Sequence, residues 1–484
     1  MQKELIQKFE KMISKYDQLD LHIKLLEMYS NSIHEIYIHK KRYSMVNNVT
    51  DEVLNDVRNN IIEQRETSKR NSRTLLYLIE SNLFIERRNT KIIDDETLKM
   101  LLAFSHWMVN LNDTADICYF TDKEAHIIVN YEYVIDNEVN SEIDEKKYTK
   151  RVYSNNNYQY AHDSSDSIYI DKVLSVFKSE TGCDLKGIFD ICYYLQMEFL
   201  QFDYLKLDYN VYRISKESLI NNLYNIVNGS DEEKYTKKQI ETNLNLLIIN
   251  PKELKTRKGK QDFFIPFNDR ENRDNRFEIK PIIFESNDLI FSPALMKNVH
   301  SLWFDGLLNF MLPYEIGIPE TRKMLLEWKK VYEDKMVYDI KNIFLTNDVS
   351  FVKINVQLHK IDRQENYPID IGDFDVIAID DVNKKIWIIE SKFLSLVANF
   401  YEMFEQQKNF FKKGKYIEKF QRRIDYMNQN YKRILKSFGF IDVTNYEVLS
   451  YMVFNKVIIS RYRKIDFPLI SITELENEIK KTIV

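Results

Sequence analysis

Hydrophobic residues in the first 110 residues of the chain recur at spacings of three and four, with almost no helix-breaking residues among them. LDLHIKLLEMYSNSIHEIYIHKKRY and NSRTLLYLIESNLFIE follow this pattern, which is typical of a helix with one apolar face. KVLSVFKSETGCDLKGIFDICYYLQMEFL and SKESLINNLYNIV repeat it further along the chain. We therefore expect a helical N-terminal region at 1–140 and a second mostly helical region at 160–275, with a charged linker at its end.

The pattern changes beyond residue 277. FEIKPIIFESNDLIFSPAL indicates strands and NVHSLWFDGLLNFML indicates a helix, so 277–320 is expected to be an α/β connecting segment. A long helix follows it. One apolar face of this helix is formed by Leu325, Trp328, Tyr332, Met336, Ile340 and Phe344.

Three strands are expected after that helix. The first alternates apolar and polar residues at Val352, Ile354, Val356 and Leu358. DFDVIAI and KIWIIESKF predict two more, joined by a turn at 380–384. The sequence thus indicates a multidomain chain, largely α-helical in its N-terminal and middle regions, with a C-terminal α/β domain at 321–484.

Composition limits the partners and the compartment. The net charge of the 484 residues is only −5, so a polyanion would have to be bound by a local basic patch. The three cysteines form no CxxC pair, which argues against structural zinc and disulfides. Without a long apolar run or an apolar leader segment, we expect a cytoplasmic protein that does not enter a membrane.

Acidic residues cluster at the far ends of the two neighbouring strands. Asp373 and Asp375 are two residues apart, as are Glu390 and Lys392, so each pair shares one face of its strand. If the strands pair through the turn, residues whose numbers sum to about 764 face each other, which brings Asp375 close to Glu390. Convergent carboxylates repel unless a divalent cation such as Mg²⁺ lies between them. Lys392 would orient or deprotonate a water molecule there.

These residues carry a resemblance to a known family. Gly372-Asp373-Phe374-Asp375-Val376 and the later Ile389-Glu390-Ser391-Lys392, with fourteen residues between Asp375 and Glu390, resemble the signature of the PD-(D/E)xK, restriction-endonuclease-like nuclease superfamily. The segment 332–337, YEDKMV, is similar to the superfamily's first core helix. The resemblance covers about residues 320–484 and implies a restriction-endonuclease-like fold for this domain.

The resemblance also implies roles for individual residues. Asp375, Glu390 and Lys392 would be the catalytic residues, with Asp375 and Glu390 as ligands of Mg²⁺, for which Mn²⁺ would substitute. Glu333 would be a supporting metal ligand and Asp373 an accessory one. In the helix expected after the signature, Gln406 or Gln407 would reach the site. Basic residues nearby would contact phosphates of the substrate: Lys412, Lys413, Lys415, Arg422 and Arg423.

The activity implied is metal-dependent hydrolysis of phosphodiester bonds, most simply in DNA, which releases a 3′-hydroxyl and leaves a 5′-phosphate. A bacterial defence setting against phage or plasmids fits such a nuclease, with a homo-oligomer or a partner subunit left open. Two alternatives also stay open: a catalytically silent nucleic-acid-binding or scaffold protein, and an RNA nuclease. The acidic residues themselves could instead form a surface ion-pair cluster at a sheet edge. No phosphate-binding loop of the GxxxxGK(S/T) type is present, which disfavours an ATP-driven enzyme.

Overall fold

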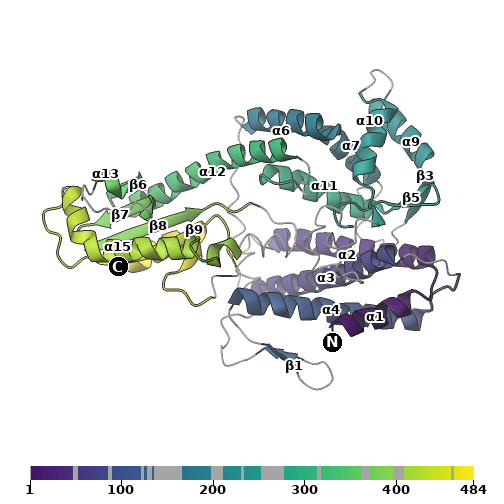
Figure 1. Cartoon of the computed structure of the whole chain (residues 1–484), viewed down its shortest axis with the longest axis horizontal. Helices are drawn as coiled ribbons and strands as arrows, with labels where there is room; N and C mark the ends of the chain where they lie inside the picture. The colour runs from purple at the N-terminus through teal and green to yellow at the C-terminus, as the bar shows by residue number, and fades with distance from the viewer. Residues whose placement is uncertain are drawn as a thin grey trace. The chain divides into compact units, whose positions relative to one another are not determined.

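The computed structural model (Figure 1) divides by its internal contacts into two units. The first comprises 1–113 and 163–326, and the second comprises 114–162 and 327–484. Within these, the structure describes residues 2–46, 53–85, 90–121, 125–127, 133–135, 166–197, 211–229, 234–251, 277–312, 318–361, 371–395, 408–458, 460 and 463–483.

Long helices form the beginning of the first unit. Side chains of Asp17 and Asp94 accept hydrogen bonds from backbone N–H groups three residues on, at Asp20 and Thr97, and so satisfy donors that a helix start leaves unpaired. The first four helices are α1 (Gln2–Ile13), α2 (Gln18–Val46), α3 (Val53–Phe84) and α4 (Asp95–Thr121).

The remainder of the first unit mixes helices with a small antiparallel sheet. A capping box between Thr236 and Gln239 starts one helix. Ser286 and Asn287 both have positive φ, as a tight two-residue hairpin requires. The elements are α6 (Asp166–Thr181), α7 (Leu185–Leu195), β3 (Tyr212–Ser215), α9 (Lys216–Asn228), α10 (Lys237–Leu246), β4 (Ile283–Glu285), β5 (Asp288–Phe291) and α11 (Pro293–Leu308). Phe277, Ile290 and Leu295 share one core with the first helices.

A mixed five-stranded sheet organises the second unit. Its strand order is β10-β9-β8-β7-β6, with β6, β7 and β8 antiparallel and β8, β9 and β10 parallel. The elements are α12 (Pro319–Thr346), β6 (Phe351–Val356), α13 (Leu358–Ile361), β7 (Phe374–Asp380), β8 (Lys385–Lys392), α15 (Tyr416–Ser437), β9 (Glu447–Phe454), β10 (Leu469–Ser471) and α16 (Ile472–Ile483). A separate two-stranded hairpin joins β1 (Ala125–Ile127) to β2 (Tyr133–Ile135). The expected architecture, a largely helical chain with a C-terminal α/β unit, is confirmed.

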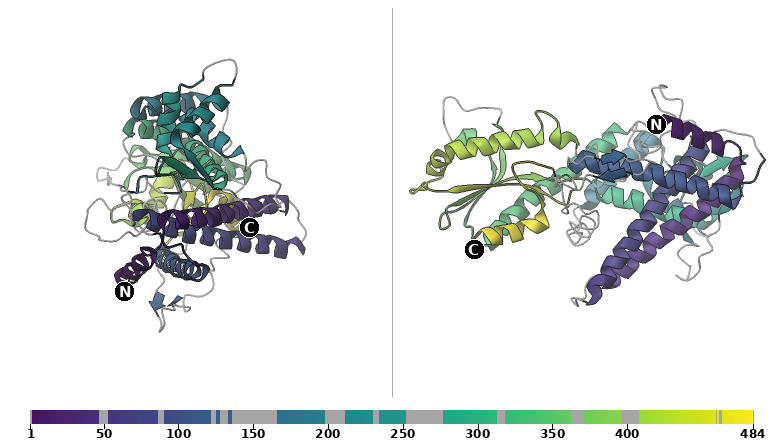
Figure 2. Two further views of the ribbon diagram at one scale, coloured as in Figure 1. Left: turned by 90° about the vertical axis from the view of Figure 1, so that its right-hand side faces the viewer. Right: turned by 90° about the horizontal axis from the view of Figure 1, so that it is seen from below.

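Helices cover both faces of the five-stranded sheet, as the right-hand view of Figure 2 shows. α15 packs on one face, where Phe420 and Met427 meet Ile377 and Ile388. α12 and α16 pack on the other, against a core that includes Trp387. The predicted apolar face of α12 is confirmed, because all six of its residues are buried.

The first predicted strand differs from the expectation at its end. β6 stops at Val356, and Leu358 lies in the short helix α13. The alternation also breaks inside the strand, since Ile354 packs towards α12 and α16 whereas Val356 packs towards α15. Asn355, between them, has a φ of +50°. A residue with left-handed backbone rotates the strand about its own axis. Ile354 and Val356, two residues apart, therefore point to opposite faces of the sheet instead of to the same one.

Within the described part of the chain, no helix is both long and apolar enough to span a membrane.

Candidate active site

The hairpin of β7 and β8 places the predicted acidic residues at one end. Its ladder runs from the pair Asp380–Lys385 to the pair Val376–Ile389, so paired residue numbers sum to 765, against the expected 764. At the turn, the Asp380 carboxylate accepts hydrogen bonds from the backbone N–H groups of Val382 and Asn383. This local cap stabilises the register on which the position of the site depends.

Asp375 lies just beyond the last pair of this ladder. Its Oδ2 accepts a hydrogen bond from the backbone N–H of Ser391 at 2.7 Å, so its side chain bonds the β8 backbone where the ladder has ended. Burial, together with the negative charge of Glu390, raises the pKa of Asp375 to about 6. The two carboxylates are therefore close enough to repel, as the sequence predicted.

Glu390 is buried at the end of β8 and contacts two cations. Its Oε1 lies 2.6 Å from Lys392 Nζ, and its Oε2 forms an ion pair with the Arg423 guanidinium from α15. The Lys392 ammonium also donates to the Ser391 carbonyl at 3.1 Å and lies 5.2 Å from the centre of the Tyr416 ring. Two carboxylates and two cations thus form one largely buried network.

The electrostatics keep Lys392 protonated. Burial alone would lower its pKa, but the carboxylates of Glu390 and Asp375 outweigh burial, so the pKa of Lys392 is raised. At neutral pH the side chain is therefore a hydrogen-bond donor. Of the two roles expected for it, orientation of a water molecule fits this charge state better than deprotonation.

Arg423 has a different contact from the one expected. Besides binding Glu390, its Nε donates to the Ile371 carbonyl at 2.7 Å, so the guanidinium faces the carboxylate network. Gly372 permits this approach: its φ is +73°, and a Cβ there would lie 3.1 Å from the guanidinium. The sequence carried a signal for this position, because Arg423 falls between Phe420 and Met427 on the apolar stripe of α15.

The break in alternation on β6 continues across to β7. Phe374 packs towards α15 and Val376 towards the opposite helices, so the change of face occurs at Asp375. The ladder between the two strands pairs residues on either side of Asp375 and Asn355 but omits these two, which stand opposite each other. Asn355, which sequence reasoning missed, therefore adjoins the backbone that orients Asp375.

The other predicted acidic residues lie apart from this network. Asp373 is exposed and accepts a hydrogen bond from Gln357 Nε2 at 3.2 Å. Glu333 is an exposed residue of α12 and pairs with Lys329 at 3.1 Å. α12 packs on one face of the sheet and α15 on the other. Arg423, which contacts Glu390, belongs to α15, so Glu333 lies on the opposite face of the sheet from Arg423.

The remaining predicted substrate contacts are only partly described. Gln406 and Gln407 fall outside the described residues. The predicted basic residues before α15 and in its first two turns are exposed: Lys412, Lys413, Lys415 and Arg422.

The donor set at the network suits a small hard cation. Asp375 and Glu390 supply carboxylates and Ser391 a carbonyl oxygen, and Mg²⁺ needs only one or two protein carboxylates because it keeps several waters. Among the described residues, no group of three or more His, Cys, Asp or Glu side chains could hold a metal ion. Burial and, after it, the charge of Glu390 raise the pKa of Asp375, and a divalent cation would relieve the repulsion between the two carboxylates.

Comparison of the chain with protein-family models, with curated proteins and with solved structures gives no match in any of the three.

Proposed function

We propose that the second unit is a metal-dependent nuclease that hydrolyses phosphodiester bonds in DNA. The observation that carries the proposal is the convergence of Asp375, Glu390 and Lys392 at one end of the β7–β8 hairpin. Here the pKa of Asp375 is raised to about 6, which is the kind of perturbation that functional sites show.

The arrangement of the unit supports the same proposal. Apart from the one-turn α13 between β6 and β7, a helix, three antiparallel strands, a helix and a parallel strand occur in the order α12, β6, β7, β8, α15 and β9. This order is similar to the core of the PD-(D/E)xK superfamily that the sequence signature resembles. In this order Asp375 lies on the second strand, β7, and Glu390 and Lys392 lie on the third, β8.

Asp375, Glu390 and the Ser391 carbonyl would hold Mg²⁺. The bound ion would supply Lewis-acid polarisation of the phosphate and a water of lowered pKa. Arg423 keeps the Glu390 carboxylate in place through its own anchor on the Ile371 carbonyl. Its contribution is to hold a ligand and thereby pre-organise the site.

Lys392 contributes a positive charge to the reaction. As a cation it donates a hydrogen bond to the attacking water or to a phosphate oxygen, where negative charge develops. The water oxygen forms a new bond to phosphorus while the bond from phosphorus to the 3′ oxygen breaks. The water loses a proton, the leaving oxygen gains one, and the products carry a 5′-phosphate and a 3′-hydroxyl.

One observation favours a second candidate, a nucleic-acid-binding protein without turnover. Both oxygens of Glu390 are engaged by cations, Lys392 on one side and Arg423 on the other. A metal ion would have to displace at least one of these ion pairs. If neither cation yields, the network is a structural element of the unit.

Cleavage assays distinguish the two candidates. The purified full-length chain is incubated with supercoiled plasmid, linear duplex, single-stranded DNA and RNA, each with Mg²⁺, Mn²⁺ or EDTA. Asp375→Asn and Lys392→Met proteins are compared with the Asp381→Asn protein, which alters an exposed acid at the opposite end of the same hairpin. The proposal expects metal-dependent products with 5′-phosphates from the wild type and from Asp381→Asn alone.

Two results would contradict the proposal. One is equal cleavage by the Asp375→Asn and wild-type proteins, which would place any activity elsewhere. The other is the absence of cleavage of all four substrates by wild-type protein that binds nucleic acid, which would favour the second candidate.

A further inference from the structure

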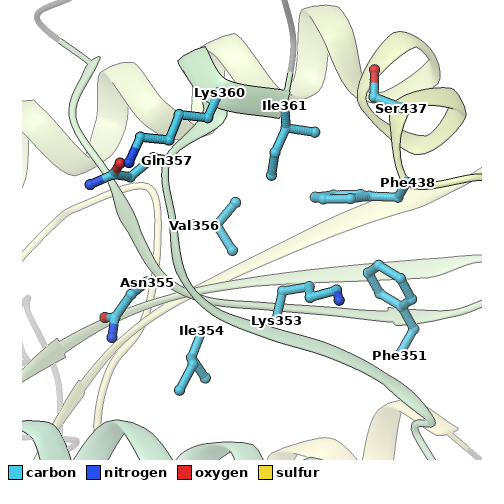
Figure 3. A pocket seen from close by; sticks show the side chains of 10 residues that line it. All are labelled: Phe351, Lys353, Ile354, Asn355, Val356, Gln357, Lys360, Ile361, Ser437 and Phe438. Atoms are coloured by element: carbon cyan, nitrogen blue, oxygen red, sulfur yellow. The ribbon is translucent and has the colours of Figure 1, made fainter.

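An open groove of about 680 Å³ runs along the outer edge of β6, the edge strand of the five-stranded sheet (Figure 3). Lys353, Asn355 and Gln357 line it from β6 and from the residue that follows the strand. Ser437 and Phe438 line it from the end of α15. The described residues that line the groove all belong to the second unit, and the groove lies at the edge of the sheet formed by β6.

Among the described residues that line it, the charge of the groove is of one sign. Lys353 and Lys360 are both exposed, and no acidic residue is among the described residues that line the groove. The other polar groups are the side-chain amides of Asn355 and Gln357 and the hydroxyl of Ser437, which can meet phosphate or base edges. The whole chain carries a net charge of −5, so this is a local basic patch of the kind that a polyanion would need.

Two half-buried aromatic rings form part of the wall. The ring centres of Phe351 and Phe438 lie 5.2 Å apart at an interplanar angle of 54°. The Lys353 ammonium lies 5.6 Å from the centre of the Phe351 ring. A basic groove that also presents aromatic rings is the usual construction for binding single-stranded nucleic acid, because unpaired bases stack on the rings.

The groove leads to the candidate active site. Gln357 lines the groove and donates to Asp373, two residues before Asp375. Asn355 lies opposite Asp375 in the register of β6 and β7. Lys353 is two residues from Asn355, about 7 Å along a strand, so a chain bound in the groove would pass beside the carboxylates.

A peptide strand is the main alternative occupant of an exposed sheet edge. Two features disfavour it here. Exposed lysine on the edge opposes strand addition, and the positive φ of Asn355 interrupts the regular backbone that an added strand would pair with. A paired duplex fits less well than a single strand, because its bases are stacked on each other and not available to Phe351 and Phe438.

We propose that this groove binds a single-stranded DNA segment next to the phosphodiester bond that is cut. Lys353 and Lys360 contact its phosphates, and Phe351 and Phe438 stack on its bases. The inference rests on the proposed function, which it deepens by naming a single-stranded substrate segment.

The test measures binding and cleavage separately on the full-length chain. Binding of a fluorescein-labelled 20-nucleotide oligo-dT is followed by anisotropy in EDTA, at several salt concentrations. Lys353→Glu and Lys360→Glu are compared with Lys481→Glu, which makes the same charge change at an exposed site on α16, the helix on the other face of the sheet. We expect each groove variant to weaken binding about tenfold and to flatten its salt dependence, with the control unchanged.

A second variant reports stacking directly. Phe438→Trp places a fluorophore in the groove, and its emission should be quenched when oligo-dT binds, because the base stacks on the indole. Since Phe438 is only half-buried, this conservative change should leave the fold intact. Bound oligo-dT without quenching would overturn the stacking contact.

The outcomes separate the two proposals. If neither the wild type nor Asp375→Asn cuts any substrate but the groove variants bind oligo-dT more weakly than Lys481→Glu, single-strand binding in the groove stands and the nuclease proposal fails. If the wild type cuts DNA while the groove variants bind and cut like Lys481→Glu, the groove inference fails alone. Tighter binding of a blunt duplex, of RNA or of an uncharged peptide than of oligo-dT would also overturn it.

Discussion

The two ends of the β7–β8 hairpin carry the same residue types in opposite electrostatic states. At the turn, Lys384 pairs with Asp381 at 2.8 Å and with Asp442 at 3.0 Å, all near the surface. Hydrogen bonds from Lys384 and Tyr446 lower the pKa of Asp381, and hydrogen bonds from Thr444 and Lys384 lower the pKa of Asp442 to about 2.

At the far end of the hairpin, the pKa of Asp375 is raised to about 6 by burial and by the charge of Glu390. The lysine there, Lys392, is mostly buried, with 20% of its side chain exposed. Lysines and carboxylates that are adjacent in sequence thus do not by themselves indicate a site. What separates the two ends is mainly burial, which with the charge of Glu390 raises the pKa of Asp375, whereas the carboxylates at the turn lie near the surface.

The largest expected difference between the two ends is in catalysis. Asp375→Asn removes a proposed metal ligand, so we expect cleavage to fall by at least about 10³-fold. Asp381→Asn should cleave like the wild type. Rates are measured at saturating Mn²⁺, and circular dichroism checks that both variants are folded. A loss of activity in Asp381→Asn as large as that in Asp375→Asn would remove the distinction between the two ends.

The next largest difference is expected in local stability. Arg423→Met leaves the buried Glu390 carboxylate with only Lys392 as a partner, which should cost about 3 kcal/mol. The measurement is hydrogen exchange of the β7–β8 backbone amides, read by mass spectrometry, since a chain of two units need not unfold in one step. Lys384→Met, which breaks an exposed pair, is the control and should leave this exchange unchanged. Equal protection in Arg423→Met and wild-type protein would show that Glu390 is hydrated.

The two ends should also respond to pH with opposite sign. The folded-state pKa of Asp375 is above its ordinary value of 3.8, so the folded state binds more protons than the unfolded state between pH 4 and 6. Stability is therefore lost as the pH rises through this interval, by about 2 kcal/mol from this residue.

Asp442 has a lowered pKa of about 2, so its stabilising contribution is present above pH 3.8 and is lost as the pH falls through 2. Thermal unfolding in EDTA, compared with Asp375→Asn and Asp442→Asn, isolates the two contributions. The prediction fails if the difference between wild type and Asp375→Asn is constant from pH 4 to 7.

The smallest effect concerns the backbone opposite Asp375. Asn355 has a φ of +50°, which glycine tolerates and a β-branched residue does not. Asn355→Val should destabilise the site by about 1–2 kcal/mol and raise the Mn²⁺ concentration needed for half-maximal cleavage. Asn355→Gly should retain the wild-type Mn²⁺ dependence even though it removes the side chain. Identical Mn²⁺ curves for both variants would show that the backbone here has no influence on Asp375.

Short-range patterns were sufficient for much of the second unit. The apolar face of α12 and the turn after Asp380 depend on residues that are neighbours in sequence, and both were predicted. The register of the hairpin followed from its turn, which brought Asp375 to Glu390 within one residue of the expectation. The period of two along β8 then placed Lys392 beside Glu390.

Tertiary structure decided what each charge contacts. Arg423, which contacts Glu390, lies 33 residues further along the chain in α15. Strand periodicity does not predict contacts with residues so distant in sequence. The exposure of Asp373 and Glu333 likewise depends on how the helices pack on the sheet. The expected alternation of side chains between the two faces of the sheet is wrong at Asn355 in β6 and at Asp375 in β7. The left-handed backbone at Asn355 and the change of face at Asp375 lie opposite each other, so they depend on both strands together.

The sequence by itself therefore determined which residues meet at the end of the hairpin, because register and period are local. Only the packing of α15 against the sheet determined how those residues are buried, paired and protonated, because burial and desolvation depend on the whole fold.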